Sequence, residues 1–155
     1  MIAGLAACGR KSDLVPSVPP TSTLEQYTRI INAQAASNHV PPGLIGAIIA
    51  VESGGNAHAT GPSGTFGLMQ LKRATAEHYG VTDLYNPSEN IAGGARYLRD
   101  LLTRFHGNVT FAVAAYKTGA RTVTEAHGVP ASANNYVERV MSLYNAVQRG
   151  TIPAY

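Results

Sequence analysis

The stretch LIGAIIAVES, residues 44–53, joins an apolar run of helical character to an acid and then to a break. Glu52 ends the run, and Ser53 is followed by two glycines, which favour the end of a helix. An acid at the C-terminal end of a helix meets the negative end of the helix dipole, and apolar neighbours exclude water from it. Both effects raise the pKa of a carboxyl group. The pattern therefore fits a general acid at Glu52, and by itself it fits a solvated acid in the last turn of a buried helix at least as well.

A glycine-rich segment follows Glu52 in the chain. Residues 61–71 read GPSGTFGLMQL, a loop that the sequence predicts to lead directly into another helix. Such a loop lets the backbone approach a ligand closely, but it is equally typical of a simple surface connection. Two further groups follow in order: NPSEN and GARYL within residues 86–98, and AAY at residues 114–116.

This ordered series of motifs resembles one family. Glu52-Ser53, then GLMQ at residues 67–70, then the 86–98 segment and Tyr116 follow one another as in the soluble lytic transglycosylase (SLT) domain. That domain is a catalytic module of the lysozyme-like superfamily, and it cleaves the glycan strands of bacterial peptidoglycan. The resemblance covers residues 40–147 and implies a mainly α, lysozyme-like (goose-type) helical domain with a substrate groove.

The resemblance also implies roles for individual residues. Glu52 matches the catalytic acid and base of the family. The residues that it implies to bind the saccharide or to shape its site are Ser53, Ser63, Gly67, Met69, Gln70, Tyr116, Lys117 and Tyr136. Met69 and Tyr136 fit core packing equally well, because a buried tyrosine needs only a partner for its hydroxyl.

Two positions depart from the family's pattern. The family usually has Ala-Tyr-Asn-Ala-Gly where residues 115–119 read AYKTG, so Lys117 places a cation where an amide would hydrogen-bond the substrate. The family commonly has a serine three residues before Gly64, where this chain has Gly61, and Ser63 lies near enough to substitute. Neither change removes the acid, so both indicate altered substrate binding or tuned activity.

Composition agrees with one exported domain. A chain of 155 residues, 45% hydrophobic and 14% charged, predicts a single globular unit, expected to be a monomer. The net charge of +3 suits an anionic surface such as the cell wall, and the twelve basic residues are scattered, which argues against a nucleic-acid partner. One cysteine and five dispersed histidines predict no disulfide framework, no metal site and no cofactor.

The amino-terminal segment carries a separate signal. Residues 5–9, LAACG, resemble a bacterial lipobox, which predicts lipidation at Cys8 and contact with a membrane only through that anchor. Residues 10–20 are polar and proline-rich, as in a tether. The residues before Cys8 are too few for a secretory leader and lack Lys and Arg. We therefore interpret residues 1–22 as a truncated leader and tether. The alternative is a short apolar terminus with an accidental free cysteine. Residues 23–150 are interpreted as the catalytic domain.

The domain is predicted to consist of helices. Thr23 is expected to cap the first helix, and a proline pair at residues 41–42 to end it and begin the next. A long helix is predicted to begin after Asn86, which would cap it, with Pro87 at its first position and Glu89 at its third. A short helix is predicted over residues 109–116 and an amphipathic one over residues 136–147, and no strand of useful length is predicted.

The small number of acidic residues limits the catalytic mechanisms that the chain can use. The chain has nine acids, and Asp83, the nearest candidate for a second catalytic carboxylate, has the setting of a turn residue before Asn86 and Pro87. An ordinary glycosidase uses two carboxylates. A lone acid suits the transglycosylase route that the resemblance implies, in which Glu52 acts first as acid and then as base to give a 1,6-anhydromuramoyl product.

Three functions stay open at this point. The first is a peptidoglycan lytic transglycosylase of the periplasm or cell envelope, either anchored by lipid or not. It would act on glycan strands in wall turnover or in local wall opening for a secretion, conjugation or pilus apparatus. The second is a lysozyme-type muramidase that uses water. The third is a catalytically weakened peptidoglycan-binding module, motivated by Lys117.

Overall fold

The computed structural model describes residues 21–153, with side chains from residue 23 onward. The predicted lipobox with Cys8 and most of the predicted tether lie outside the described residues. The elements in chain order are α1 (Thr21–Glu25), α2 (Thr28–Asn38), α3 (Pro42–Glu52), β1 (Thr60–Gly61), β2 (Thr65–Phe66), β3 (Leu71–Lys72), α4 (Arg73–His78), α5 (Pro87–Arg104), α6 (Val109–Thr118), α7 (Ala120–Glu125), a 3₁₀ turn (Ala131–Ala133) and α8 (Asn134–Gln148). None of the described helices is long and apolar enough to cross a membrane.

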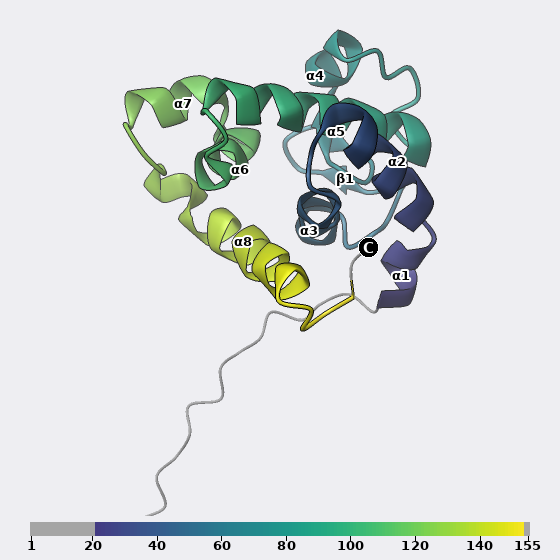
Figure 1. The fold of residues 1–155 in the computed structure, drawn as a ribbon. Helices are drawn as coiled ribbons and strands as arrows, with labels where there is room; N and C mark the ends of the chain where they lie inside the picture. The colour runs from purple at the N-terminus through teal and green to yellow at the C-terminus, as the bar shows by residue number, and fades with distance from the viewer. Residues whose placement is uncertain (1–20, 154–155) are drawn as a thin grey trace, which may run out of the picture.

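Helix α3 is the centre of the fold. Every residue from 43 to 50 is buried, and Figure 1 shows the helix in the middle of the molecule, with α8 on one side and α2 on the other. Gly43 allows the close approach of α8, because a Cβ there would lie 2.9 Å from Val147 Cγ1. Burying a large aliphatic side chain stabilises a fold by roughly 1.5–3 kcal/mol, so the apolar run of α3 is the main reason that the other helices gather around it.

The long helix α5 begins as the sequence predicts. The Asn86 side chain accepts hydrogen bonds from the backbone N–H groups of Ser88 and Glu89, and Pro87 occupies the first turn. Glu89, however, does not turn back to its own helix start. Its carboxylate accepts hydrogen bonds from Thr82, through both the backbone N–H and the hydroxyl, and from the Asp83 N–H, so it fixes the preceding loop.

Two local predictions were wrong, and one feature had no counterpart in the predictions. Thr23 lies inside α1 and caps nothing, because the chain breaks at residues 26–27 and α2 begins afresh at Thr28. The antiparallel sheet β1-β2-β3 was not predicted, because its strands have two residues each and so show no alternation; no strand longer than these is present among the described residues. The GLMQ segment does not run directly into a helix, because Gln70 has a φ of 48° and β3 intervenes before α4 begins at Arg73.

Candidate active site

A cavity of about 900 Å³ lies at the C-terminal end of α3. One wall is the sheet and its turns, residues 59–72, which we call the sheet wall. The other wall contains residues 116–119 at the end of α6 together with Arg139 of α8, and we call it the helix wall. The volume falls within the range of pockets that take small organic ligands.

Glu52 lies between the two walls, at the last position of α3. Of the described residues that line the cavity, it is the only acid. Burial raises the pKa of the Glu52 carboxyl group, and the charges of Lys117 and Arg139 and the Tyr136 hydroxyl lower that pKa in part. Desolvation by apolar neighbours therefore acts as the sequence predicts, and it favours the protonated form that a proton donor needs.

Two buried tyrosines, Tyr116 and Tyr136, lie near Glu52. The Tyr116 hydroxyl donates a hydrogen bond to the Met69 carbonyl oxygen at 2.9 Å. The Tyr136 hydroxyl lies close enough to Glu52 to lower the pKa of its carboxyl group, but it forms no hydrogen bond of ordinary geometry, and no other buried side-chain polar atom in residues 23–153 lacks a partner. Burial raises the pKa of both hydroxyls well above its usual range. Both tyrosines therefore stay protonated, and the Tyr136 hydroxyl keeps a proton near the acid.

Ser53 connects Glu52 to the sheet wall. Its hydroxyl donates to the Leu68 carbonyl oxygen at 2.8 Å and accepts from the Gly55 N–H at 3.2 Å. The hydroxyl is thus occupied within the protein, although Ser53 lines the cavity. Its position beside Glu52 indicates that it fixes the end of α3 against the GLMQ segment.

Gln70 holds the sheet wall together from inside. Its side-chain nitrogen donates to the carbonyl oxygens of Ala59, at 3.1 Å, and Gly67, at 2.9 Å, and its side-chain oxygen accepts from the Thr65 hydroxyl at 2.8 Å. A Cβ at Gly61 would overlap the Thr65 hydroxyl and would lie 2.6 Å from the Gln70 oxygen. The bond between Thr65 and Gln70 therefore explains why this chain has glycine at position 61.

Asn90 is a site-forming residue that sequence reasoning missed. It is fully buried in α5, accepts a hydrogen bond from the Met69 N–H at 2.8 Å, and donates to the carbonyl oxygens of Phe66 and Leu84. Gly67, with a φ of 76°, has no room for a side chain against Asn90 and Leu84. The only signal in the sequence was a polar residue beside Ile91 at the start of an apolar helix face.

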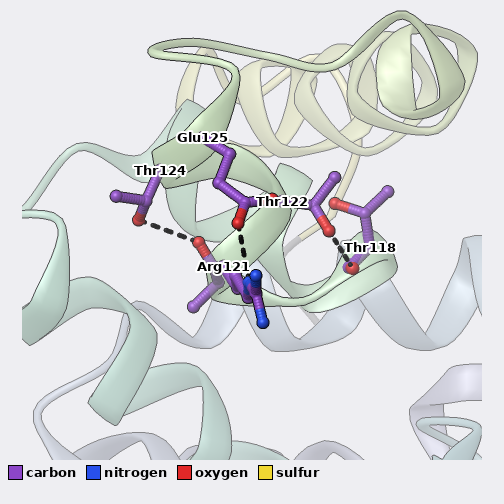
Figure 2. Close-up of polar contacts among 6 residues, drawn as sticks. Thr118, Arg121, Thr122, Thr124 and Glu125 are labelled. Carbon is purple, nitrogen blue, oxygen red and sulfur yellow. Dashed lines mark hydrogen bonds and ion pairs between the residues drawn. The ribbon is translucent and has the colours of Figure 1, made fainter.

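The helix wall carries cations that are free of ion pairs. The Lys117 ammonium group lies 5.1 Å from the centre of the Tyr136 ring, a cation–π contact. Arg139 also lines the cavity, and sequence reasoning missed it, as it missed Lys72 on the sheet wall. Within residues 23–153 the one ion pair joins Arg121 to Glu125 on α7, outside the cavity lining (Figure 2).

The structure brings most of the predicted site residues together. Those that line the cavity are Glu52, Ser53, Ser63, Gln70, Tyr116 and Lys117. Gly67, Met69 and Tyr136 are buried and do not line it. Asp83 lies outside the lining, in a turn where its carbonyl oxygen accepts from the Asn86 N–H. Among the described side chains, no group of three His, Cys, Asp or Glu residues could hold a metal ion.

Comparison with known proteins identifies the family. The Transglycosylase SLT domain family matches residues 29–138. The chain belongs to this family. The SLT domain is 43% identical over 94 residues to the transglycosylase of Enterobacteria phage PRD1, covering 61% of this chain and 35% of that protein. It is 38% identical over 94 residues to membrane-bound lytic murein transglycosylase F of Cronobacter sakazakii, covering 57% of this chain and 18% of that protein.

A solved structure agrees with this assignment. The 70 kDa soluble lytic transglycosylase from Escherichia coli superposes with a TM-score of 0.70 at 26% identity, covering 80% of this chain and 24% of that one. The prediction of a mainly α, lysozyme-like SLT fold is confirmed. The chain spans about a third or less of the length of the curated relatives that it matches.

Proposed function

We propose that this SLT domain is a peptidoglycan lytic transglycosylase. It would cleave the β-1,4 bond between N-acetylmuramic acid and N-acetylglucosamine without water and leave a 1,6-anhydromuramoyl end. The observation that carries the proposal is Glu52, a desolvated acid that stands alone in its cavity among the described acids. The names of the relatives, a phage transglycosylase and a lytic murein transglycosylase, support the same substrate.

The first step uses Glu52 as a general acid. Its protonated carboxyl group donates to the glycosidic oxygen as the bond from that oxygen to C1 of the muramic sugar breaks, and the N-acetylglucosamine leaves with a new hydroxyl group. Burial keeps the carboxyl protonated at a higher pH than in water. The Tyr136 hydroxyl, which lacks another partner, can then donate to the carboxylate that forms.

The second step uses the same residue as a base. The Glu52 carboxylate takes the proton from the C6 hydroxyl of the muramic sugar, and that oxygen bonds to C1. The acid returns to its protonated form and no water is consumed. A mechanism with one carboxylate fits this cavity better than a hydrolase mechanism with two, because Asp83 lies in a turn outside the cavity.

The other site residues take supporting roles in this proposal. Gln70 and Ser53, with their polar atoms used inside the protein, shape the groove and fix the end of α3. Ser63 and Lys117 line the cavity and are free to contact the saccharide. Tyr116 holds the GLMQ segment through the Met69 carbonyl oxygen, and Gly67 gives that segment its turn.

The cellular setting is part of the same proposal. We place the domain, residues 23–150, in the periplasm or cell envelope as a monomer, where its substrate is found. Residues 1–22 would supply a tether and a lipid anchor at Cys8, in keeping with the name of one relative, membrane-bound lytic murein transglycosylase F. Its task would be wall turnover or the local opening of the wall for a secretion, conjugation or pilus apparatus.

A pair of Glu→Gln variants tests the function. Glu52→Gln should slow the release of soluble fragments from purified peptidoglycan by about a thousandfold, because a general acid contributes roughly 10²–10⁴-fold. Glu138→Gln, an exposed acid on α8 outside the cavity, should leave the rate unchanged. Equal rates for wild type and Glu52→Gln would refute the role of Glu52, and no release by the wild type would favour a binding module.

Measuring the stability of the Glu52→Gln variant distinguishes a loss of activity from a loss of the folded structure. Because the pKa of Glu52 is raised in the folded protein, ionisation of Glu52 destabilises the fold as the pH rises above the ordinary value of 4.5. Glutamine cannot ionise. The variant should therefore unfold at a higher temperature than wild type at pH 7, and the difference should shrink toward pH 4. A variant that is less stable at pH 7 would contradict the burial argument.

A further inference from the structure

The charge of the cavity is unbalanced. Its charged lining residues are Lys72, Lys117, Arg139 and Glu52, three cations and one acid. When Glu52 is protonated, as the first step requires, no negative charge remains among these lining residues. Positive walls around a concave site concentrate anionic ligands and raise their association rates. The charges of the cavity lining therefore favour ligands that carry negative charge.

Two of the cations lie on one wall and close to the acid. Lys117 and Arg139 both act electrostatically on Glu52, whereas Lys72 on the sheet wall shows no such effect. Neither Lys117 nor Arg139 forms an ion pair or a side-chain hydrogen bond with any described residue. Lys117 instead rests over the Tyr136 ring, which orients its ammonium group without neutralising it. Both groups are exposed and ready for an external anion.

We propose that Lys117 and Arg139 form an anion subsite that binds a carboxylate on the substituent of the muramic sugar. The inference rests on the proposed function, which places the cleaved bond at Glu52. That sugar carries a lactyl ether on C3, two ring atoms from the C1 that reacts, so its substituent lies within one sugar ring of Glu52. A planar guanidinium group and an ammonium group suit carboxylate binding.

Two sources supply this carboxylate. When a peptide is attached, the lactyl group is an amide and the free carboxylates belong to the peptide. When the peptide has been removed, the lactyl group itself ends in a carboxylate. In either case an amide at position 117, as in the family's pattern, would lack the charge, so the subsite is a property of this chain's Lys117.

Binding measured without turnover tests the subsite separately from the reaction. The full chain carrying Glu52→Gln is titrated with tetrasaccharide fragments of peptidoglycan in three forms. One has its peptides intact, one has its peptide carboxylates converted to neutral amides, and one has no peptide and a free lactyl carboxylate. We expect amidation to weaken binding by about fivefold, because a partly exposed ion pair contributes at most about 1 kcal/mol.

Charge-removing variants assign that difference to the helix wall. Adding Lys117→Asn or Arg139→Gln should bring the Kd values for intact and amidated fragments together. Arg149→Gln, which removes a charge at the end of the same helix α8 but outside the cavity, should preserve the fivefold difference. If the peptide-free fragments bind as tightly as the intact ones, the lactyl carboxylate is sufficient. If they bind as weakly as the amidated fragments, the subsite takes the peptide carboxylates.

Two results would overturn the inference. Equal affinity of the Glu52→Gln protein for intact and amidated fragments would show that no carboxylate is recognised. A preference that survives both Lys117→Asn and Arg139→Gln would place recognition elsewhere. Either result would leave the proposed reaction untouched. The reaction is tested by cleavage with the wild-type protein, whereas the subsite is tested by binding to the Glu52→Gln variant.

Discussion

Gln70 and Thr65 on the sheet wall use their polar groups differently from the two cations on the helix wall. On the sheet wall the amide of Gln70 and the hydroxyl of Thr65 are bonded to each other or to the backbone, and Asn90 supports them from behind. On the helix wall Lys117 and Arg139 have no ion-pair or hydrogen-bond partner among the described residues. The buried Tyr136 hydroxyl, which lies near Glu52 but does not line the cavity, has no partner either. Glu52 lies between the walls.

The difference indicates which residues of the site hold its shape and which are available to a ligand. Satisfied polar groups fix a shape, because breaking any bond leaves a buried group without a partner. Unsatisfied charges at a cavity are available to a ligand and to the acid. We therefore expect substitutions at the bonded residues of the sheet wall to change stability. Substitutions of Lys117 or Arg139 should change the pH dependence and substrate preference of an otherwise stable protein.

Removing the support of the sheet wall should have the largest effect on stability. Asn90→Ala leaves the Met69 N–H and the carbonyl oxygens of Phe66 and Leu84 without their partner, in the core. The free energy of unfolding should fall by about 3 kcal/mol, measured by urea denaturation. Asn145→Ala, an exposed asparagine on α8, is the matched control and should change it by less than about 0.5 kcal/mol. Similar losses for the two variants would contradict the role of Asn90.

Restoring the family's serine on the sheet wall should also destabilise the protein. Gly61→Ser places a Cβ against the Thr65 hydroxyl and 2.6 Å from the Gln70 oxygen, which should cost about 2 kcal/mol in urea denaturation. In a Thr65→Ala background the cost should be smaller, since the new hydroxyl can then donate to Gln70. If the cost is the same in both backgrounds, the two residues are not coupled as the contact indicates.

On the helix wall, removing one charge should shift the pH dependence and leave the fold intact. Lys117 lowers the pKa of Glu52, so Lys117→Asn should raise that pKa further. The groups that act on Glu52 would then be Arg139 and the Tyr136 hydroxyl. Because the acid must be protonated, the alkaline fall in kcat/KM should move to higher pH. Glycan strands with amidated peptides serve as substrate, so that the charge of the substrate does not contribute. If the alkaline fall in kcat/KM does not move, Lys117 does not act on the pKa of Glu52.

An exposed ion pair away from both walls should matter least. Figure 2 shows Arg121 directed at Glu125 one turn along α7. Both side chains are exposed. Arg121→Gln should change the free energy of unfolding by less than about 0.5 kcal/mol and leave kcat/KM unchanged. A clear loss of activity would extend the functional surface beyond the cavity.

Local signals explain which features of the fold could be predicted. The cap at Asn86 and the apolar run of α3 act over a few residues, and the structure confirms the helices that they begin or fill. The break before α2 and the two-residue strands have no such signal. The segment that holds the strands is fixed by contacts between distant residues, such as the hydrogen bond from the Met69 N–H to the Asn90 side-chain oxygen, 21 residues apart.

The site divides in the same way. Glu52, Gln70 and Tyr116 were found because they lie in motifs that keep their order along the chain. Arg139 belongs to none of those motifs and reaches the cavity only through the packing of α8 against α3. Gly61 could be noticed as a departure, but its cause, the bond between Thr65 and Gln70, is visible only in three dimensions.

The mass of the fragments released from purified peptidoglycan tests the central claim most directly. If Glu52 acts alone as acid and base, the wild-type chain should release fragments lighter by one water molecule than fragments with a reducing end, and Glu52→Gln should release almost none. Fragments with ordinary reducing ends would show that water is the nucleophile, and the mechanism with a single carboxylate would then be wrong.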